Sequence, residues 1–345
     1  MTPLTAHKLL WQVVLSLILL VGVVGICSLV GSERVNLSQV LKGPLVDSIN
    51  TDYEILVRIR LPRIAAAGLI GAALAISGVV FQALLRNPLA DPYILGISSG
   101  AALGAVIALS FGLSATVAWG SPIGLAAFVG AILTVWAVFG IASAAGRRHP
   151  ATLLLAGVVV NAFLSAVILF LTSVAQGAKL QATVFWLMGN LNNAAVGGGP
   201  ILAVIAVALV VVLTILMRLS GALNILSFSP EEAQTVGVNP RRTHRIAFAC
   251  AALITALAVS VSGLIGFVGL IVPHTVRLLL GPDHRQLIPL SAVVGAAFLI
   301  LADTVARVVV APAQLPVGIV TALIGGPFFL LLLLRPSNRT RGISL

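Results

Sequence analysis

Residues 62–83 read P-R-I-A-A-A-G-L-I-G-A-A-L-A-I-S-G-V-V-F-Q-A, and this stretch decides the fold. Eighteen residues between Arg63 and Gln82 carry no charge, and nearly all of them are apolar or small. A helix of about 20 predominantly apolar residues crosses the roughly 30 Å of hydrocarbon in a bilayer. We therefore interpret 62–83 as a membrane-spanning helix.

Similar apolar runs, bounded by charged residues or by Pro and Gly, lie on both sides of this stretch. We predict about ten spans in one transmembrane domain over residues 1–345, which makes the fold class an all-α integral membrane protein. The other nine spans are 10–30, 93–111, 121–141, 151–174, 197–217, 246–265, 267–280, 287–307 and 316–334. Pro273 and three glycines near the junction of the seventh and eighth spans predict a broken helix there.

The composition excludes an ordinary soluble protein. Apolar residues make up 59% of the chain and charged residues 8%, and the mean hydropathy is +1.15. Soluble domains carry roughly 25% charged residues. The net charge of +11 is scattered through short loops, so we attribute it to membrane topology rather than to nucleic acid. Cys27 and Cys250 lie inside apolar runs and indicate neither a disulfide framework nor a metal site.

The distribution of basic residues predicts that both termini are cytoplasmic. In that orientation thirteen of the twenty basic residues lie inside, as the positive-inside rule requires. The seven outside are Arg34, Lys42, Arg58, Arg60, Arg63, Lys179 and Arg307. Such outward basic residues suit either docking of an acidic partner or pairing with lipid phosphates or nearby acids, and charge alone leaves both open.

Asp303 is the carboxylate clearly within a span, one helical turn before Arg307, so we favour a structural ion pair there. Sparse carboxylates argue against a carrier driven by protons or sodium ions. The chain also lacks the G-x-x-x-x-G-K-[ST] phosphate loop, so any ATPase must be a separate subunit. Gly96, Gly100 and Gly104 share one helix face and predict close packing of another helix.

The longest predicted cytoplasmic loop covers about 218–245. Ser229, Pro230, Glu231 and Glu232 form a strong helix start, with a capping hydroxyl, Pro in the first turn and early acidic residues. Gly237 and Pro240 are expected to stop this helix. The segment, with Ala233 and Val236 within it, is predicted to be either a partner-docking element or an ordinary loop helix.

Several motifs resemble the FecCD-type permease family, the transmembrane subunits of bacterial ABC importers for ferric siderophores, haem and cobalamin. They include R-I-R-L-P-R (58–63), R-N-P-L-A-D-P-Y (86–93), W-L-M-G-N-L (186–191), G-F-V-G-L-I-V-P-H (266–274) and A-D-T-V-A-R (302–307). The resemblance covers essentially the whole chain in the family's order. It implies a type II ABC importer architecture in the bacterial inner membrane.

The resemblance also implies partners and site residues. The partners are a second copy of this chain, two copies of an ABC ATPase inside, membrane lipid, and a periplasmic or extracellular binding protein outside. Binding-protein docking would fall to Arg60, Arg63 and Arg307, and the cytoplasmic gate to Asn87 and Leu89. ATPase coupling would fall to the segment that contains Pro230, Glu231, Glu232, Ala233, Val236, Gly237 and Pro240. The resemblance implies no catalytic residue, cofactor or metal ligand in this chain.

The function expected from these observations is import of a metal chelate by alternating access between the two sides of the membrane. The substrate implied first is a ferric siderophore, with haem and cobalamin left open. The alternative is an ion-coupled secondary transporter that works without an ATPase.

Overall fold

The computed structural model describes residues 5–44, 50–113, 121–144, 150–191, 199–227 and 230–334. Seven of the described helices are long and apolar enough to cross a membrane: α1 (Ala6–Leu29), α4 (Leu61–Leu84), α6 (Pro122–Ala144), α7 (Pro150–Val174), α10 (Gly199–Leu226), α12 (Pro240–Ser262) and α14 (His284–Val308). Three shorter apolar helices are α5 (Ile97–Ser110), α13 (Val268–Leu280) and α15 (Val317–Leu334). The remaining elements are α2 (Leu37–Val40), α3 (Thr51–Tyr53), the π-helical turns of η1 (Glu54–Arg60), the 3₁₀ turn η2 (Pro92–Leu95), α8 (Ala178–Leu187) and α11 (Pro230–Thr235).

Each of the ten predicted spans coincides with one of these long or shorter apolar helices, so the predicted all-α membrane fold is confirmed. The predicted break is also present, because α12 ends at Ser262 and α13 begins at Val268. Gly263 has a φ of +69°, a backbone conformation that suits a residue without a side chain. Pro273 lies inside α13 rather than at the break.

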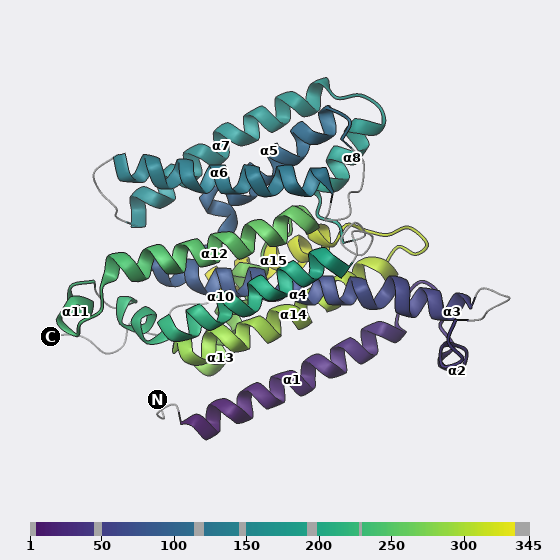
Figure 1. The fold of residues 1–345 in the computed structure, drawn as a ribbon, viewed down its shortest axis with the longest axis horizontal. Helices are drawn as coiled ribbons and strands as arrows, with labels where there is room; N and C mark the ends of the chain where they lie inside the picture. The colour runs from purple at the N-terminus through teal and green to yellow at the C-terminus, as the bar shows by residue number, and fades with distance from the viewer. Residues whose placement is uncertain are drawn as a thin grey trace.

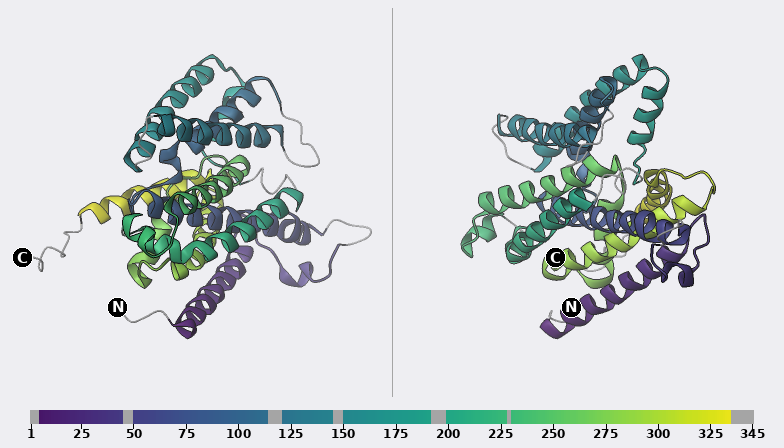
Figure 2. Two further views of the ribbon diagram at one scale, coloured as in Figure 1. Left: turned by 60° about the vertical axis from the view of Figure 1, so that its left-hand side comes forward. Right: turned by 45° about the vertical axis from the view of Figure 1, so that its right-hand side comes forward.

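Helix α4 lies at the centre of the bundle, packed against α10, α12, α13 and α14 (Figure 1). Helices α5, α6, α7 and α8 form a group on one side, and α5 and α6 join it to the centre by packing on α12. Helix α1 lies along the opposite edge, against α14. The two views of Figure 2 show the same separation between the group around α6 and the rest of the bundle.

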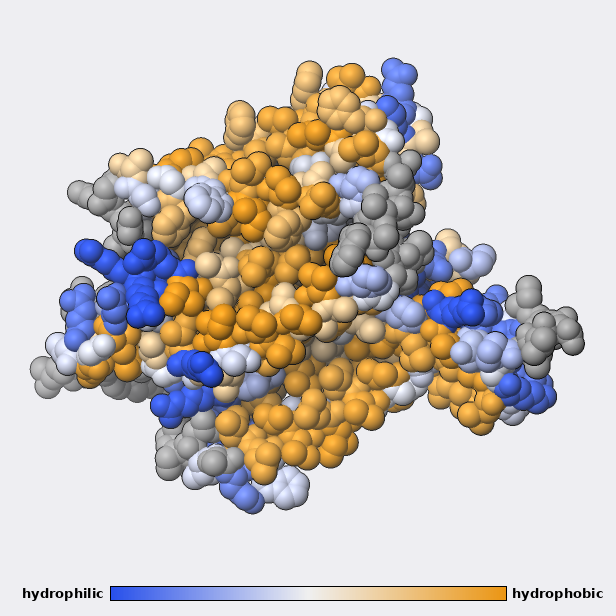
Figure 3. Space-filling model, viewed as in Figure 1, coloured by the Kyte–Doolittle hydropathy of each residue, from blue (hydrophilic) through white to orange (hydrophobic). Residues whose placement is uncertain are grey.

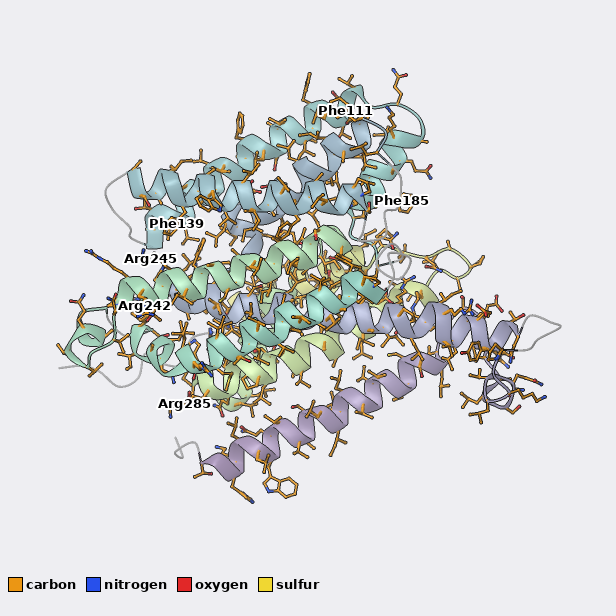
Figure 4. The ribbon with its side chains drawn as sticks, in the orientation of Figure 1. Phe111, Phe139, Phe185, Arg242, Arg245 and Arg285 are labelled. Carbon is orange, nitrogen blue, oxygen red and sulfur yellow. The ribbon has the colours of Figure 1, made fainter. Side chains whose placement is uncertain are left out.

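Apolar side chains form a broad band across the middle of the molecule, and hydrophilic side chains gather at its two ends (Figure 3). One end carries Arg242, Arg245 and Arg285, as the labels in Figure 4 show. The other end carries α2 and α3. This pattern is typical of a protein that spans a bilayer. We refer to the arginine-rich end, where α1 also begins, as the inner end and to the other as the outer end.

Glycines let the helices approach closely, as their spacing in the sequence predicts. On α5, a Cβ at Gly104 would collide with the backbone oxygen of Ala126 on α6. One turn earlier, a Cβ at Gly100 would collide with Thr134 and with the oxygen of Gly130. Such contacts bring two helix backbones together. The resulting van der Waals packing stabilises helix association inside a membrane, where the hydrophobic effect does not drive it. The predicted packing face is therefore confirmed for Gly100 and Gly104, whereas Gly96 lies before α5 as its N-cap, with a φ of +78°.

Three segments that are distant in sequence also meet through glycines, at the outer end. A Cβ at Gly263 would collide with the backbone oxygen of Trp186, and a Cβ at Gly318 with that of Met188. The backbone N–H of Asn190 donates to the oxygen of Ser262 at 2.8 Å. The end of α12, the residues after α8 and the start of α15 are thus packed backbone to backbone.

Candidate functional site

Two of the arginines predicted to dock a partner share one carboxylate at the outer end. Nε of Arg63 lies 3.0 Å from each oxygen of Asp303, and its Nη2 donates to Oδ1 at 2.8 Å. Nε of Arg307 forms an ion pair with Oδ2 of the same Asp303 at 3.2 Å. Oε1 of Gln314 accepts from Nη1 of Arg63 at 2.8 Å. We call these four residues the outer cluster, and it connects α4 to α14 and to the residues before α15.

The three charged residues of the outer cluster are buried, whereas Gln314 is exposed. The side chains of Arg63, Asp303 and Arg307 are 5%, 1% and 7% exposed. The ion pair predicted from the spacing of Asp303 and Arg307 is confirmed, and Arg63 is a further partner from 240 residues away. Removing one partner of a buried ion pair is strongly destabilising, because it leaves an uncompensated charge away from water. In the described chain, these residues therefore connect helices.

The third predicted docking residue, Arg60, holds the end of α1. Its Nη1 donates to the backbone oxygens of Ser28 and Leu29, each at 3.1 Å, and its Nη2 donates to the oxygen of Glu33. The last carbonyl groups of a helix lack partners within the helix, and a cation there also suits the helix dipole. Arg60 thus fastens α1, which otherwise lies at the edge of the bundle, to the start of α4.

Arg58 is the most exposed member of the R-I-R-L-P-R motif. Its side chain is 67% exposed and forms an ion pair with Glu54 at 3.3 Å, one helical turn away. Arg60, Arg63 and Arg307 are all buried against partners of this chain. A docking role for these three stays a prediction, and it requires them to exchange those partners for groups of another protein.

The predicted gate residues lie on the turn that follows α4. Oδ1 of Asn87 accepts from the backbone N–H of Leu89 at 2.9 Å, which is an Asx turn. Both side chains are partly exposed. After the turn, η2 enters the core, where Ile94 lies against Gly157 of α7 and Pro92 against Gly269 of α13. The turn is therefore held between helices from both parts of the bundle.

Asp91 is a buried carboxylate that the sequence analysis did not single out. Its Oδ1 accepts from the backbone N–H of Tyr93 at 3.0 Å and so caps η2. Burial raises the pKa of Asp91 to about 6, although bonds from the backbone N–H groups of Tyr93 and Phe267 act in the opposite direction. The signal available in the sequence was an Asp directly before Pro92, which is a common helix start.

A short helix, α11, lies in the segment predicted to couple to the ATPase, and its end has the predicted chemistry. The coupling role stays a prediction. Gly237 has a φ of +80°, and its N–H donates to the oxygen of Gln234 at 3.1 Å. The N–H of Val238 donates to the oxygen of Ala233 at 2.9 Å. These two bonds form a Schellman motif, which ends a helix with glycine in the left-handed region. Ser229, the predicted capping residue, lies outside the described residues.

The residues of this segment differ in exposure. Ala233 is fully buried within this chain, whereas Val236 is 63% exposed. Pro240 begins α12 rather than ending a loop, because Oδ1 of Asn239 caps that helix by accepting from the N–H of Arg242 at 3.1 Å. Helix α10 reaches Leu226, so the connection between α10 and α12 is shorter than the predicted 218–245.

Comparison with known proteins agrees with this architecture. Residues 17–335 match the model of the FecCD transport family. The chain is 49% identical over 275 residues to the cobalamin import system permease protein BtuC of Halobacterium salinarum. This match covers 80% of this chain and 72% of that protein. The chain is 42% identical over 293 residues to the hemin transport system permease protein HmuU of Yersinia pestis, covering 84% and 86%.

A solved structure is similar over nearly the whole chain. It is described as an inward-facing conformation of a metal-chelate type ABC transporter, and it superposes with a TM-score of 0.80 at 33% identity. The match covers 93% of this chain and 98% of that one. The chain, a multi-pass protein of the inner (cell) membrane, thus belongs to the FecCD transport family.

Proposed function

We propose that this chain is the membrane-spanning subunit of an ATP-driven importer that carries a metal chelate into the cytoplasm. The observation that carries the proposal is the family match across residues 17–335 of a chain built from apolar helices. Relatives are named for cobalamin and hemin transport, so the substrate class we propose is a bulky chelate. A ferric siderophore is our first candidate, and haem and cobalamin are the others.

ATP hydrolysis in this proposal belongs to a separate subunit. The chain contains no Gly-Lys pair and therefore no phosphate loop. The alternative, a carrier driven by an ion gradient, would need a carboxylate that is free to bind a proton or sodium ion. Asp303 in α14 is engaged by Arg63 and Arg307, and the buried Asp91 accepts from the N–H of Tyr93 as the cap of η2, so both carboxylates have structural partners, which disfavours that alternative. We propose a homodimer of this chain with two ATPase copies at its inner end.

The outer end is where we propose that a binding protein delivers the chelate. Its support is the set of basic residues on the side where the positive-inside rule disfavours them. The side chain of Arg58 is 67% exposed, so a partner can reach it and share or replace its ion pair with Glu54. Arg60, Arg63 and Arg307 would join the contact only if acidic groups of the binding protein replace their present partners. Contacts of this kind govern the rate of encounter and its salt dependence.

The inner end is where we propose that ATPase movement enters the chain. Helix α11 lies there, and Val236 at its end is exposed while Ala233 faces this chain. A groove of the ATPase would receive the exposed side of α11. Closure of the ATPase would move α11, and the turn of Asn87 and Leu89 would open or close the inner gate. Chelate would then pass by alternating access.

Crosslinking tests the ATPase contact. We would place single cysteines at Val236 and Ala233 in variants that lack Cys27 and Cys250, and co-express them with an ATPase carrying cysteines along its groove. Val236→Cys is expected to crosslink, and Ala233→Cys, a matched control three residues away, is not. The absence of a crosslink at Val236 in every nucleotide state would exclude α11 as the coupling element.

The substrate is tested with a panel of chelates. The complex with ATPase and binding protein is reconstituted in vesicles, and ATP hydrolysis is measured with ferric siderophore, haem and cobalamin in turn. The proposal expects one chelate, loaded on the binding protein, to stimulate hydrolysis. Stimulation by none of the three, in a complex that assembles, would refute the proposed substrate class.

A further inference from the structure

A single amide side chain connects the end of α10 to the start of α14 at the inner end. Nδ2 of Asn224 donates to Oδ1 of Asp283 at 2.7 Å. Its Oδ1 accepts from the backbone N–H of His284 at 2.8 Å and lies 2.7 Å from Nδ1 of the same residue. We call this set of contacts among Asn224, Asp283 and His284 the inner joint.

The chemistry of the inner joint requires an amide at position 224. An amide oxygen can only accept, so the close approach of His284 Nδ1 places a hydrogen on that nitrogen. Asp283, as a carboxylate, can only accept, so a bond from position 224 requires a donor such as the amide NH₂. His284 is 4% exposed, which shields its bonds to Asn224 from water, whereas Asn224 and Asp283 are half-buried. Neither a carboxylate nor an apolar side chain at 224 would satisfy both neighbours.

The inner joint is more than a cap of α14. Oδ1 of Asp283 already accepts from the backbone N–H of Arg285 at 2.9 Å, which is the capping bond of that helix. Asn224 adds a bond from a different helix, 59 residues away in sequence. Arg285, the next residue of α14, is labelled in Figure 4 at the same end as Arg242 and Arg245 of α12.

The inner joint lies close in sequence to α11. Asn224 lies two residues before α10 ends at Leu226, and α11 begins at Pro230, so only a short connection separates the joint from α11. Helix α14 runs from the joint to the outer cluster, where Asp303 holds Arg63 and Arg307. This helix is therefore tied by polar contacts at both of its ends, half-buried at the inner joint and buried at the outer cluster.

We propose that Asn224 is a positioning residue that transmits displacement of α11 to α14, and through α14 to the outer cluster. The inference rests on the proposed role of α11 as the element that the ATPase moves. A joint of this kind makes α10 and α14 move together at the inner end. Without it, α11 would move while α14 stays in place, and ATP hydrolysis would continue without transport.

Three variants test the inner joint. Asn224→Asp places two carboxylates against each other without a donor and breaks the joint. Asp283→Asn is the matched control, because its oxygen still accepts from Asn224 and from the N–H of Arg285. The double variant returns a donor to position 283, which can bind Asp at 224, so it is expected to recover part of the loss.

The quantity to measure is chelate transported per ATP hydrolysed by the full complex in vesicles. Asn224→Asp is expected to lower this ratio about tenfold or more, the size associated with losing a hydrogen bond to a charged group. The crosslink from Val236→Cys to the ATPase should persist, and Asp283→Asn, which keeps the acceptor oxygen, should lower the ratio less than Asn224→Asp does. These results separate lost transmission from lost assembly.

Two results would overturn the inference. One is a wild-type ratio in Asn224→Asp. The other is a loss of transport that matches a loss of folded complex, with no recovery in the double variant. Failure of the proposed function looks different, because the Val236→Cys crosslink would then be absent in the otherwise unchanged chain.

Discussion

Replacing Asp303 by Asn removes the one negative charge that two buried arginines share. The amide is nearly the same size, so packing is kept while Arg63 and Arg307 lose their counter-ion. Their side chains are 5% and 7% exposed, so water cannot take its place. Breaking a buried ion pair from one side costs about 3–5 kcal/mol. We expect the unfolding free energy of Asp303→Asn to fall by about that amount.

The matched control is Glu54→Gln, which breaks the exposed pair with Arg58. The side chains of that pair are 35% and 67% exposed, and such surface pairs contribute about 0–1 kcal/mol. Both variants are unfolded in detergent by increasing denaturing surfactant, followed by helical circular dichroism. Adding Arg63→Met to Asp303→Asn removes one stranded cation and should recover part of the loss. Equal midpoints for Asp303→Asn and Glu54→Gln would show that Asp303 does not stabilise Arg63 and Arg307 as a buried counter-ion.

Three further changes have outcomes that follow from the described contacts. Gly104→Ala should destabilise the bundle by about 1–3 kcal/mol because the added methyl group meets the backbone of α6. Gly140→Ala is the control, because open space surrounds that position, and it should not destabilise the bundle. Equal effects in the same unfolding assay would contradict the close packing of α5 on α6. Asp91→Asn should become more stable relative to wild type as pH rises from about 4 to 7. The folded pKa of Asp91, near 6, lies above its unfolded value, so the wild type loses stability as the buried carboxylate becomes charged. A stability difference that does not change with pH would contradict the raised pKa. Arg58→Glu should slow binding-protein association and reduce its salt dependence in a surface-binding assay, and unchanged kinetics would remove Arg58 from the docking surface.

Features encoded within one segment could be predicted from the sequence. The spans follow from apolar runs, and the close packing of another helix on α5 follows from glycines four residues apart. The end of α11 follows from Gly237, whose left-handed backbone closes a Schellman motif. The i, i+4 pair of Asp303 and Arg307 is likewise local. Each is decided by neighbours along one helix, so a single sequence contains the information.

Features that join distant segments could not be predicted in the same way. Arg63 meets Asp303 across 240 residues, and Asn224 meets Asp283 across 59, with no periodic pattern to connect them. For this reason the sequence suggests that the outward arginines form an exposed surface, although the structure buries Arg60 against the end of α1. Burial in a bundle depends on which helices are neighbours, and that arrangement emerges only from the packing of all of them.

Whether a separate ATPase drives chelate import through this chain is tested by uptake of radiolabelled chelate into vesicles that hold this chain with its ATPase and binding protein. We expect uptake that requires ATP and all three proteins and that continues after proton and sodium gradients are collapsed. Uptake by this chain alone, driven by an ion gradient without the ATPase, would contradict this expectation.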